Sequence, residues 1–185
     1  HYRLSLHLST AILIIANLFW LIKNVIKNTN KIFFKISYEN FPFLFLILII
    51  FIQIIVGALV SGLDAGKIYQ TWPLMGSNYL PNDLSFYHLG SIFDFDNHSL
   101  VQFYHRNLAY FIILYILILT IHIYKKKLSK LFKPLKILLF FMSAQVILGI
   151  YTLISGLNIY LASLHQITSI FLIFSALNLY YFRAK

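Results

Sequence analysis

Hydrophobic residues come in runs of about twenty, the length an α-helix needs to cross roughly 30 Å of hydrocarbon. Polar and basic segments separate these runs, and no run contains an acidic residue. A charge buried in lipid is costly, so the pattern predicts an all-α integral membrane protein. The expected transmembrane helices are Leu4–Ile22, Phe43–Gly62, Leu100–Tyr124, Leu135–Ser155 and Tyr160–Phe182.

The basic residues lie mostly in the connections on one side of these helices. Of the fifteen, twelve fall between the first and second predicted helices, between the third and fourth or at the start of the fourth, or after the fifth. The positive-inside rule assigns that side to the cytoplasm or the mitochondrial matrix. Because the lysines cluster in short loops and line no exposed face, the net charge of +10 does not indicate nucleic acid. The sequence contains no cysteine, which excludes disulfides and thiolate ligands.

Two internal repeats divide the chain. Residues Tyr2–Thr10 match Tyr160–Thr168 in Tyr, Ser, Leu, His and Thr at a constant offset. A second repeat relates two helices through a Gln-x-x-x-Gly pattern and a final Ser-Gly-Leu, at Gln53, Gly57, Gln145 and Gly149. Repeated halves are common in membrane proteins.

The repeats predict a unit of four helices. Residues 41–185 would form one complete four-helix bundle, whereas residues 1–40 would supply the last helix of a preceding, pseudo-symmetric bundle and a cytoplasmic loop. The sequence begins with His1 and no signal peptide precedes it, so we expect it to begin inside a longer protein.

The connection 63–99 is much longer than usual between packed helices, and such loops are often functional. It carries aromatic residues that favour the headgroup layer of a membrane, namely Tyr69, Trp72, Tyr79, Phe86 and Tyr87. We expect this loop to lie over the outer end of the bundle. The alternative is a loosely held extracellular linker.

His105 and His165 are the strongest candidates for chemistry. Each lies about five residues into its predicted helix, so both reach the same depth, roughly 8 Å below the outer end. Heme iron accepts two axial imidazoles from opposite faces, and facing helices of a bundle commonly hold it. The alternative is that each histidine is only hydrogen-bonded to a neighbouring helix.

The remaining histidines have no partner at equal depth. His7 matches His165 in the repeat, so its partner is expected outside this chain. His122 lies about 26 Å from His105 at the cytoplasmic end, where an interfacial role is expected. His88 and His98 belong to the long loop or its border, and His1 is too close to the start to interpret.

Other polar residues offer fewer possibilities. Arg106 could pair with a heme propionate or reach lipid headgroups. Gln53 and Gln145, each four residues before a glycine, suit close helix packing. The sequence shows no nucleophilic triad, phosphate-binding glycine loop or paired intramembrane carboxylates, so a cofactor must supply any chemistry.

At these residues the sequence resembles the heme A synthase family of mitochondria and alphaproteobacteria. The resemblance rests on Gly57–Gly76, Val101–Arg106, Leu164–Gln166 and Tyr2–Leu8. It implies an eight-helix protein that oxidises a methyl group of heme O to the formyl group of heme A. Heme O synthase and terminal oxidase assembly are then the expected partners, with membrane lipid around the chain and an electron donor that stays unassigned.

The resemblance also implies roles for individual residues. His105 and His165 would ligate a low-spin heme b, and His7 would line or ligate the substrate heme of the other bundle. No catalytic residue is assignable here, because the acidic residue linked to turnover would lie in helices that this sequence lacks. The chain alone is therefore not expected to be active.

Two other functions compete with this one. A b-type cytochrome that only transfers electrons would use the same histidine pair, and a small transporter or scaffold would need no cofactor. The long loop and His7 favour the heme-modifying oxidoreductase, since a one-heme relay requires neither.

Overall fold

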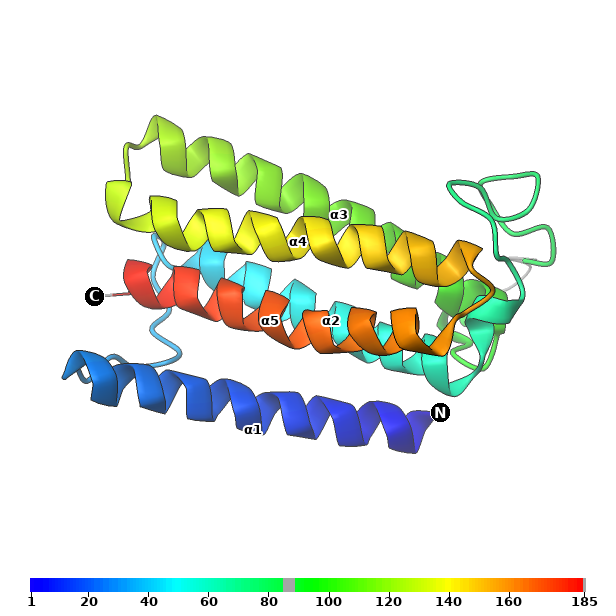
Figure 1. The fold of residues 1–185 in the computed structure, drawn as a ribbon, viewed down its shortest axis with the longest axis horizontal. Coiled ribbons are helices and arrows are strands. Elements are labelled where there is room, and N and C mark those ends of the chain that lie inside the picture. The colour runs from blue at the N-terminus through cyan, green and yellow to red at the C-terminus, as the bar shows by residue number, and fades with distance from the viewer. Residues whose placement is uncertain (85–88, 185) are drawn as a thin grey trace.

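Five long α-helices make up most of the chain in the computed structural model, which describes residues 1–84 and 89–184 (Figure 1). Each is long and apolar enough to cross a membrane, so the predicted all-α membrane class is confirmed. The helices are α1 (Tyr2–Lys27), α2 (Phe41–Gly62), α3 (His98–Lys125), α4 (Phe132–Ile154) and α5 (Ile159–Arg183).

Every predicted span falls on one of these helices to within a residue at its end, but the helices begin one to three residues earlier. Capping explains two of these starts. The side chain of Asn97 accepts a hydrogen bond from the backbone of Leu100, and that of Asn158 accepts bonds from Tyr160 and Leu161. An N-cap side chain satisfies an amide that the helix leaves free, so the helix starts at the cap and not at the first apolar residue.

Helices α2 to α5 form a four-helix bundle, and α1 lies beside it against α2 and α5 (Figure 1). The hairpins α2–α3 and α4–α5 are the closely packed pairs, and they contact each other through α2 with α5 and α3 with α4. Helix α3 therefore faces α5 across the bundle, and α2 faces α4. Residues on α3 and α5 can approach one another only through the bundle interior.

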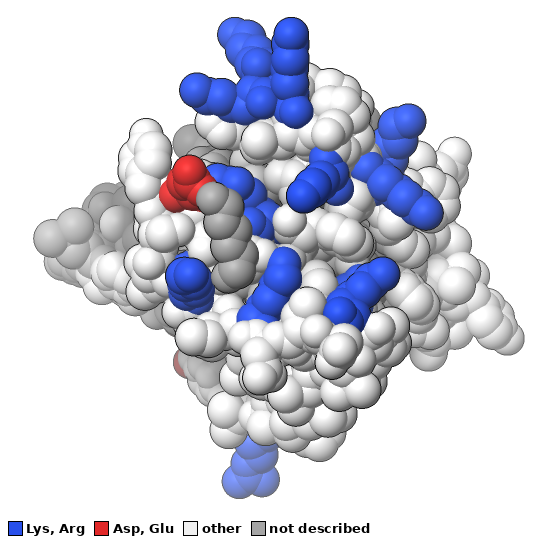
Figure 2. Space-filling model, turned by 90° about the vertical axis from the view of Figure 1, so that its left-hand side faces the viewer, with Lys and Arg blue, Asp and Glu red and all other residues white. Residues whose placement is uncertain are grey.

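The two ends of the bundle differ in charge. We call the end that carries the connections 28–40 and 126–131 the lysine end, and the opposite end the loop end. Figure 2 views the lysine end, where Lys and Arg side chains are spread over the surface. The connection between α2 and α3 lies at the loop end and contains two short 3-10 helices, η1 (Ala65–Lys67) and η2 (Leu89–Phe93).

The apolar core is concentrated near the lysine end. Leu46, Ile50, Ile116, Leu138 and Leu177 are almost fully buried there. By contrast, none of residues 139–171, which form the loop-end halves of α4 and α5, is buried. At the loop end the buried residues therefore come from α2 and α3, such as Leu59, Leu100 and Val101, and not from α4 and α5.

Candidate heme site

The two predicted ligands lie on helices that face each other across the bundle. His105 is seven residues into α3 and His165 is six residues into α5, each about 10 Å from the loop end of its helix. Helices α3 and α5 run in the same direction from the loop end, so the two residues lie at a similar level in the bundle. The structure thus brings together the pair that the sequence placed at equal depth.

Each imidazole lies against a glycine of the neighbouring helix in its hairpin. A Cβ atom built on Gly57 would lie 3.0 Å from Cε1 of His105, and one built on Gly149 would lie 3.0 Å from Cε1 of His165. These distances are tighter than ordinary van der Waals contact. The two hairpins therefore repeat one arrangement, in which the absence of a side chain on one helix makes room for a ring on the next.

This arrangement gives the repeated glycines a more specific role than the close helix packing expected from the sequence. The signal was the Gln-x-x-x-Gly repeat. Gln53 adds to it, because its amide donates a 3.0 Å hydrogen bond to the backbone oxygen of His105 and also lies 3.5 Å from the ring nitrogen Nε2. The backbone of α3 is thus held at the candidate ligand.

Several buried polar atoms at this level have no hydrogen-bond partner in the described part of the chain. They include Nδ1 of His105, Nδ1 of His165, and the amide oxygens of Gln53 and Gln145. Leaving such atoms unpaired costs about 1–3 kcal/mol each, so proteins rarely do so without a reason. These four atoms form a polar cluster where a ligand would be held, and none of them has a hydrogen-bond partner in the described part of the chain.

An open, largely apolar groove of about 300 Å³ lies between α3 and α4, lined by Ile113, Met142, Ser143, Val146 and Ile147 and by neither histidine. It begins about two turns from His105 along α3 and about one turn from Gly149 along α4. Two imidazoles on facing helices, each seated over a glycine, unpaired polar atoms around them and an apolar groove nearby fit a heme group.

Arg106 follows His105 but points to the long loop. Its guanidinium donates hydrogen bonds to the backbone oxygens of Tyr69 (2.9 Å), Thr71 (2.9 Å) and Leu74 (3.2 Å). Gln102, one turn earlier on α3, donates to the same oxygen of Tyr69 at 2.8 Å. Three of the five guanidinium N–H groups are used in this way, and the predicted bond to a propionate stays a prediction.

Asp83 ties the loop to α3 at a second place. Its carboxylate accepts hydrogen bonds from the hydroxyls of Tyr69 (2.7 Å) and Ser99 (2.6 Å). Partial burial raises the pKa of Asp83, but these two hydrogen bonds outweigh it and hold the pKa below its ordinary value. Tyr79 makes a third attachment by bonding to Asn107. The expectation that the loop lies over the end of the bundle is confirmed for its described residues.

Phe86, Tyr87 and His88 lie outside the described residues. Trp72 is about half exposed, so the loop's aromatic residues do not all pack inward.

Acid is expected to loosen this attachment. The pKa of Asp83 is lower in the folded state than in the unfolded state. The Asp83 carboxylate therefore stabilises the loop fully above its unfolded pKa of about 4, and this stabilisation is lost as the pH falls through its folded pKa. The protection of residues 69–76 against hydrogen exchange, corrected for the intrinsic exchange rate at each pH, should therefore fall in acid. Asp83→Asn should show fast exchange already at neutral pH, whereas Asp64→Asn, which removes only an exposed ion pair with Lys67, should not. Equal exchange in both variants would contradict the anchoring role.

The other histidines do not join the pair. His7 is exposed on α1, outside the bundle, and His98 and His122 are exposed near the two ends of α3. His1 pairs with Asp96 at 2.8 Å. Within residues 1–84 and 89–184, no three His, Cys, Asp or Glu side chains gather as a metal site. The role predicted for His7 in a second heme site stays a prediction.

Comparison with known proteins shows which family this sequence matches. Residues 1–177 match the COX15-CtaA family, described as cytochrome oxidase assembly protein. The chain is 42% identical over 178 residues to the heme A synthase of Pelagibacter ubique (strain HTCC1062), covering 95% of this chain and 51% of that protein. It is 39% identical over 178 residues to the heme A synthase of Wolbachia pipientis wMel, covering 96% and 49%.

A third relative shows the same extent of similarity. The heme A synthase of Rickettsia africae (strain ESF-5) is 36% identical over 180 residues, covering 94% of this chain and 52% of that protein. The chain thus spans about half the length of the curated relatives it matches. The resemblance inferred from the motifs is confirmed, and the chain belongs to the COX15-CtaA family of cytochrome oxidase assembly proteins.

Proposed function

We propose that this chain acts in heme A biosynthesis, as the half of a heme A synthase that holds heme b between His105 and His165. The whole reaction would oxidise a methyl group of heme O to the formyl group of heme A. The observation that carries the proposal is the pair of imidazoles on facing helices, each seated over a glycine. Family membership, and relatives that are named heme A synthase, support the choice of reaction.

The chain's own residues would bind and orient the cofactor. Heme b, when bound, supplies an iron that can accept and release one electron. His105 and His165 would hold it, and Gln53 keeps the α3 backbone in place at His105. The loop fixed by Arg106 covers the end of α3 and would limit access of water. The guanidinium's remaining N–H groups would pair with a propionate.

The substrate heme would lie elsewhere. We place His7 beside heme O in a second bundle, because His7 is exposed on α1, outside the four-helix bundle. The relatives contain a further half to which this chain has no match, and the acidic residue linked to turnover would lie there. This chain alone would therefore bind heme b without forming heme A. Heme O synthase would supply the substrate, and terminal oxidase assembly would use the product.

Co-expression tests the proposal. The chain is produced alone, and together with the half of the Pelagibacter relative that it does not match, in a host that makes heme O but lacks its own heme A synthase. Extracted hemes are identified by mass and by their pyridine spectra. We expect only heme b on the chain alone, and heme A only when both halves are present. His105→Ala in the pair should abolish heme A and serves as the control.

The possible results separate the competing functions. Heme b on the chain with no heme A from the pair would favour a cytochrome that only transfers electrons. A chain that stays colourless in both cases would contradict the heme site itself.

The orientation in the membrane is a further part of the proposal. We place the lysine end in the cytoplasm or mitochondrial matrix, within the bacterial plasma membrane or mitochondrial inner membrane, because that end carries most of the basic residues. The chain has no cysteine, so Lys126→Cys and Asp94→Cys each introduce a single thiol. An impermeant maleimide applied to intact cells should label Asp94→Cys only. Labelling of Lys126→Cys instead would reverse the orientation.

A further inference from the structure

The lysine end carries positive charge with few counter-ions. Figure 2 shows basic side chains distributed around this end. Glu39, in the connection 28–40, is the acidic residue of this end, since the other four are aspartates at the loop end, namely Asp64, Asp83, Asp94 and Asp96. The excess of cations at the point where membrane helices end creates a strong local field for anions.

A pocket of about 240 Å³ lies within this surface, between the α3–α4 turn and the last residues of α5. Lys127, Lys130 and Arg183 bring three cations to it, and Ser129 brings a hydroxyl. Leu131 and Phe182 are among its apolar lining residues. Cations and a hydroxyl beside apolar side chains suit a ligand that is anionic at one end and apolar at the other.

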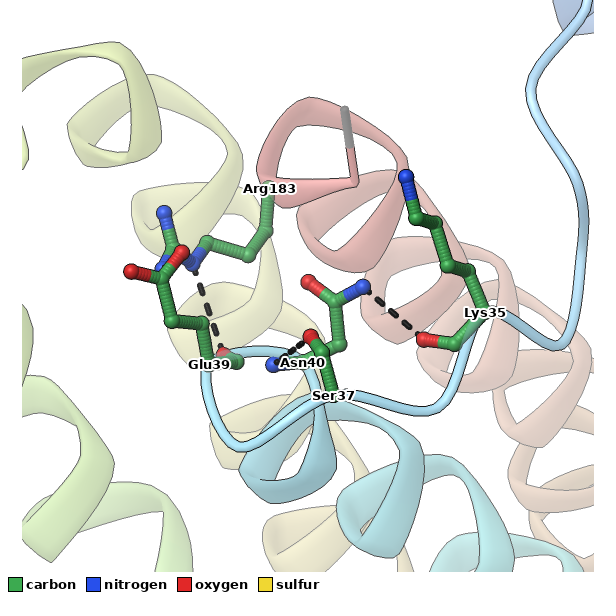
Figure 3. A network of polar contacts seen from close by, with 5 residues as sticks. All are labelled: Lys35, Ser37, Glu39, Asn40 and Arg183. Carbon is green, nitrogen blue, oxygen red and sulfur yellow. Dashed lines mark hydrogen bonds and ion pairs between the residues drawn. The ribbon is translucent and has the colours of Figure 1, made fainter.

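Arg183 is held in position by the only acid nearby. Its Nη2 lies 2.5 Å from the carboxylate of Glu39, and its Nε donates to the Glu39 backbone oxygen at 3.4 Å (Figure 3). The turn that carries Glu39 is itself tied by hydrogen bonds from Asn40 to Lys35 and Ser37. Arg183 is thus fixed at the pocket edge, with its other terminal nitrogen in no hydrogen bond within the described residues.

The two lysines of the pocket lack such a partner. Neither Lys127 nor Lys130 forms an ion pair with an acidic side chain in the described part of the chain. Lys31 lies nearby, where its ammonium donates to backbone oxygens at the end of α5. Burial, and after it the positive charge of Lys130, lower the pKa of Lys31. An anion bound in the pocket would relieve this repulsion between like charges.

We propose that this pocket binds a phosphate-bearing anion, and that its source is the headgroup of an anionic phospholipid. The phosphate would lie among Lys127, Lys130 and Arg183, and the glycerol and acyl part would lie on Leu131 and Phe182. The position favours lipid over free phosphate, because the pocket lies at the ends of membrane-crossing helices, where headgroups are concentrated.

Two double variants of equal charge test the pocket. K127Q/K130Q removes two pocket cations, whereas K133Q/K136Q removes two lysines in the first turns of α4 that do not line it. The full chain is placed in nanodiscs of phosphatidylcholine, and binding of labelled phosphatidylglycerol is titrated. Each basic residue near an anionic headgroup contributes about fivefold, so the pocket variant should bind about thirtyfold more weakly and the control much less so. Helix content by circular dichroism checks that both variants are folded.

Two results would overturn the inference. Equal weakening by both double variants would mean that only the general surface charge attracts lipid. Displacement of the labelled lipid by millimolar inorganic phosphate would assign the pocket to a free anion. Arg183→Gln gives an independent check, because removal of the third pocket cation should weaken lipid binding about fivefold, and unchanged binding would contradict a role for Arg183.

Discussion

Replacing either His105 or His165 by alanine is expected to remove the bound heme b. Each change deletes one of the two axial ligands, and no other His side chain in the described part of the chain lies in the same cluster. Loss of outer-shell partners alone weakens metal binding about 10–100-fold, so loss of a ligand should leave less than about a tenth of the heme. The measurement is the reduced-minus-oxidised spectrum of the purified chain, with extracted heme quantified per protein.

Exposed histidines provide matched controls for this result. His98→Ala and His122→Ala make the same chemical change on the same helix as His105, and both should retain full heme. Added imidazole should restore a six-coordinate spectrum in His105→Ala and His165→Ala, because it can occupy the space left by the ring. Unchanged heme content in both ligand variants would refute the pairing, and failure of imidazole to restore the spectrum would point to loss of the fold.

Gly57→Ala and Gly149→Ala are expected to weaken heme binding while stabilising the helices. The new methyl group would meet the histidine ring at 3.0 Å, so the ring must move by a few tenths of an ångström. Alanine is better than glycine inside a helix by about 0.5–1 kcal/mol. Heme retention should fall about tenfold, in line with loss of other supporting contacts around a metal, as the unfolding temperature holds or rises. Gly57→Val should be more severe.

Gly90→Ala is the control for this pair, because nothing lies within 4 Å of the Cβ it would add. It should change neither heme content nor spectrum. The decisive observation is a loss of heme without a fall in the unfolding temperature. A glycine with only a packing role would lower heme content and unfolding temperature together. A wild-type spectrum in Gly57→Ala and Gly149→Ala would show that the close approach has no functional role.

Periodicity and length were enough to predict the five helices, because crossing a membrane imposes a run of apolar residues that few other structures need. Matched depth predicted that His105 and His165 lie at one level, because both helices start at the same end of the bundle, and the structure places them on facing helices. Their pairing as ligands stays a prediction. The starts of α3 and α5 were predicted two residues and one residue too late, because Asn97 and Asn158 cap these helices through local backbone bonds that apolar periodicity does not reveal.

Contacts that depend on the path of the backbone were not predictable. Arg106 binds three loop oxygens, and backbone oxygens occur at every residue, so their positions leave no mark in the sequence. The seating of His105 over Gly57 likewise depends on the distance between two helices. The repeated Gln-x-x-x-Gly pattern predicted close helix packing at Gly57 and Gly149, but it did not predict that a histidine ring packs on each glycine.

The uneven burial of residues along the bundle has a consequence for the order of assembly. The lysine-end half is held together by its own side chains, whereas residues 139–171 contribute no buried residue at the loop end. If heme b is held as proposed, the polypeptide would reach its membrane topology first and receive the heme afterwards, with the groove between α3 and α4 as a route from the lipid. Loading would then rigidify one half of a molecule whose other half is already set, and backbone exchange should slow on loading in 139–171 but not around Leu46 and Leu177.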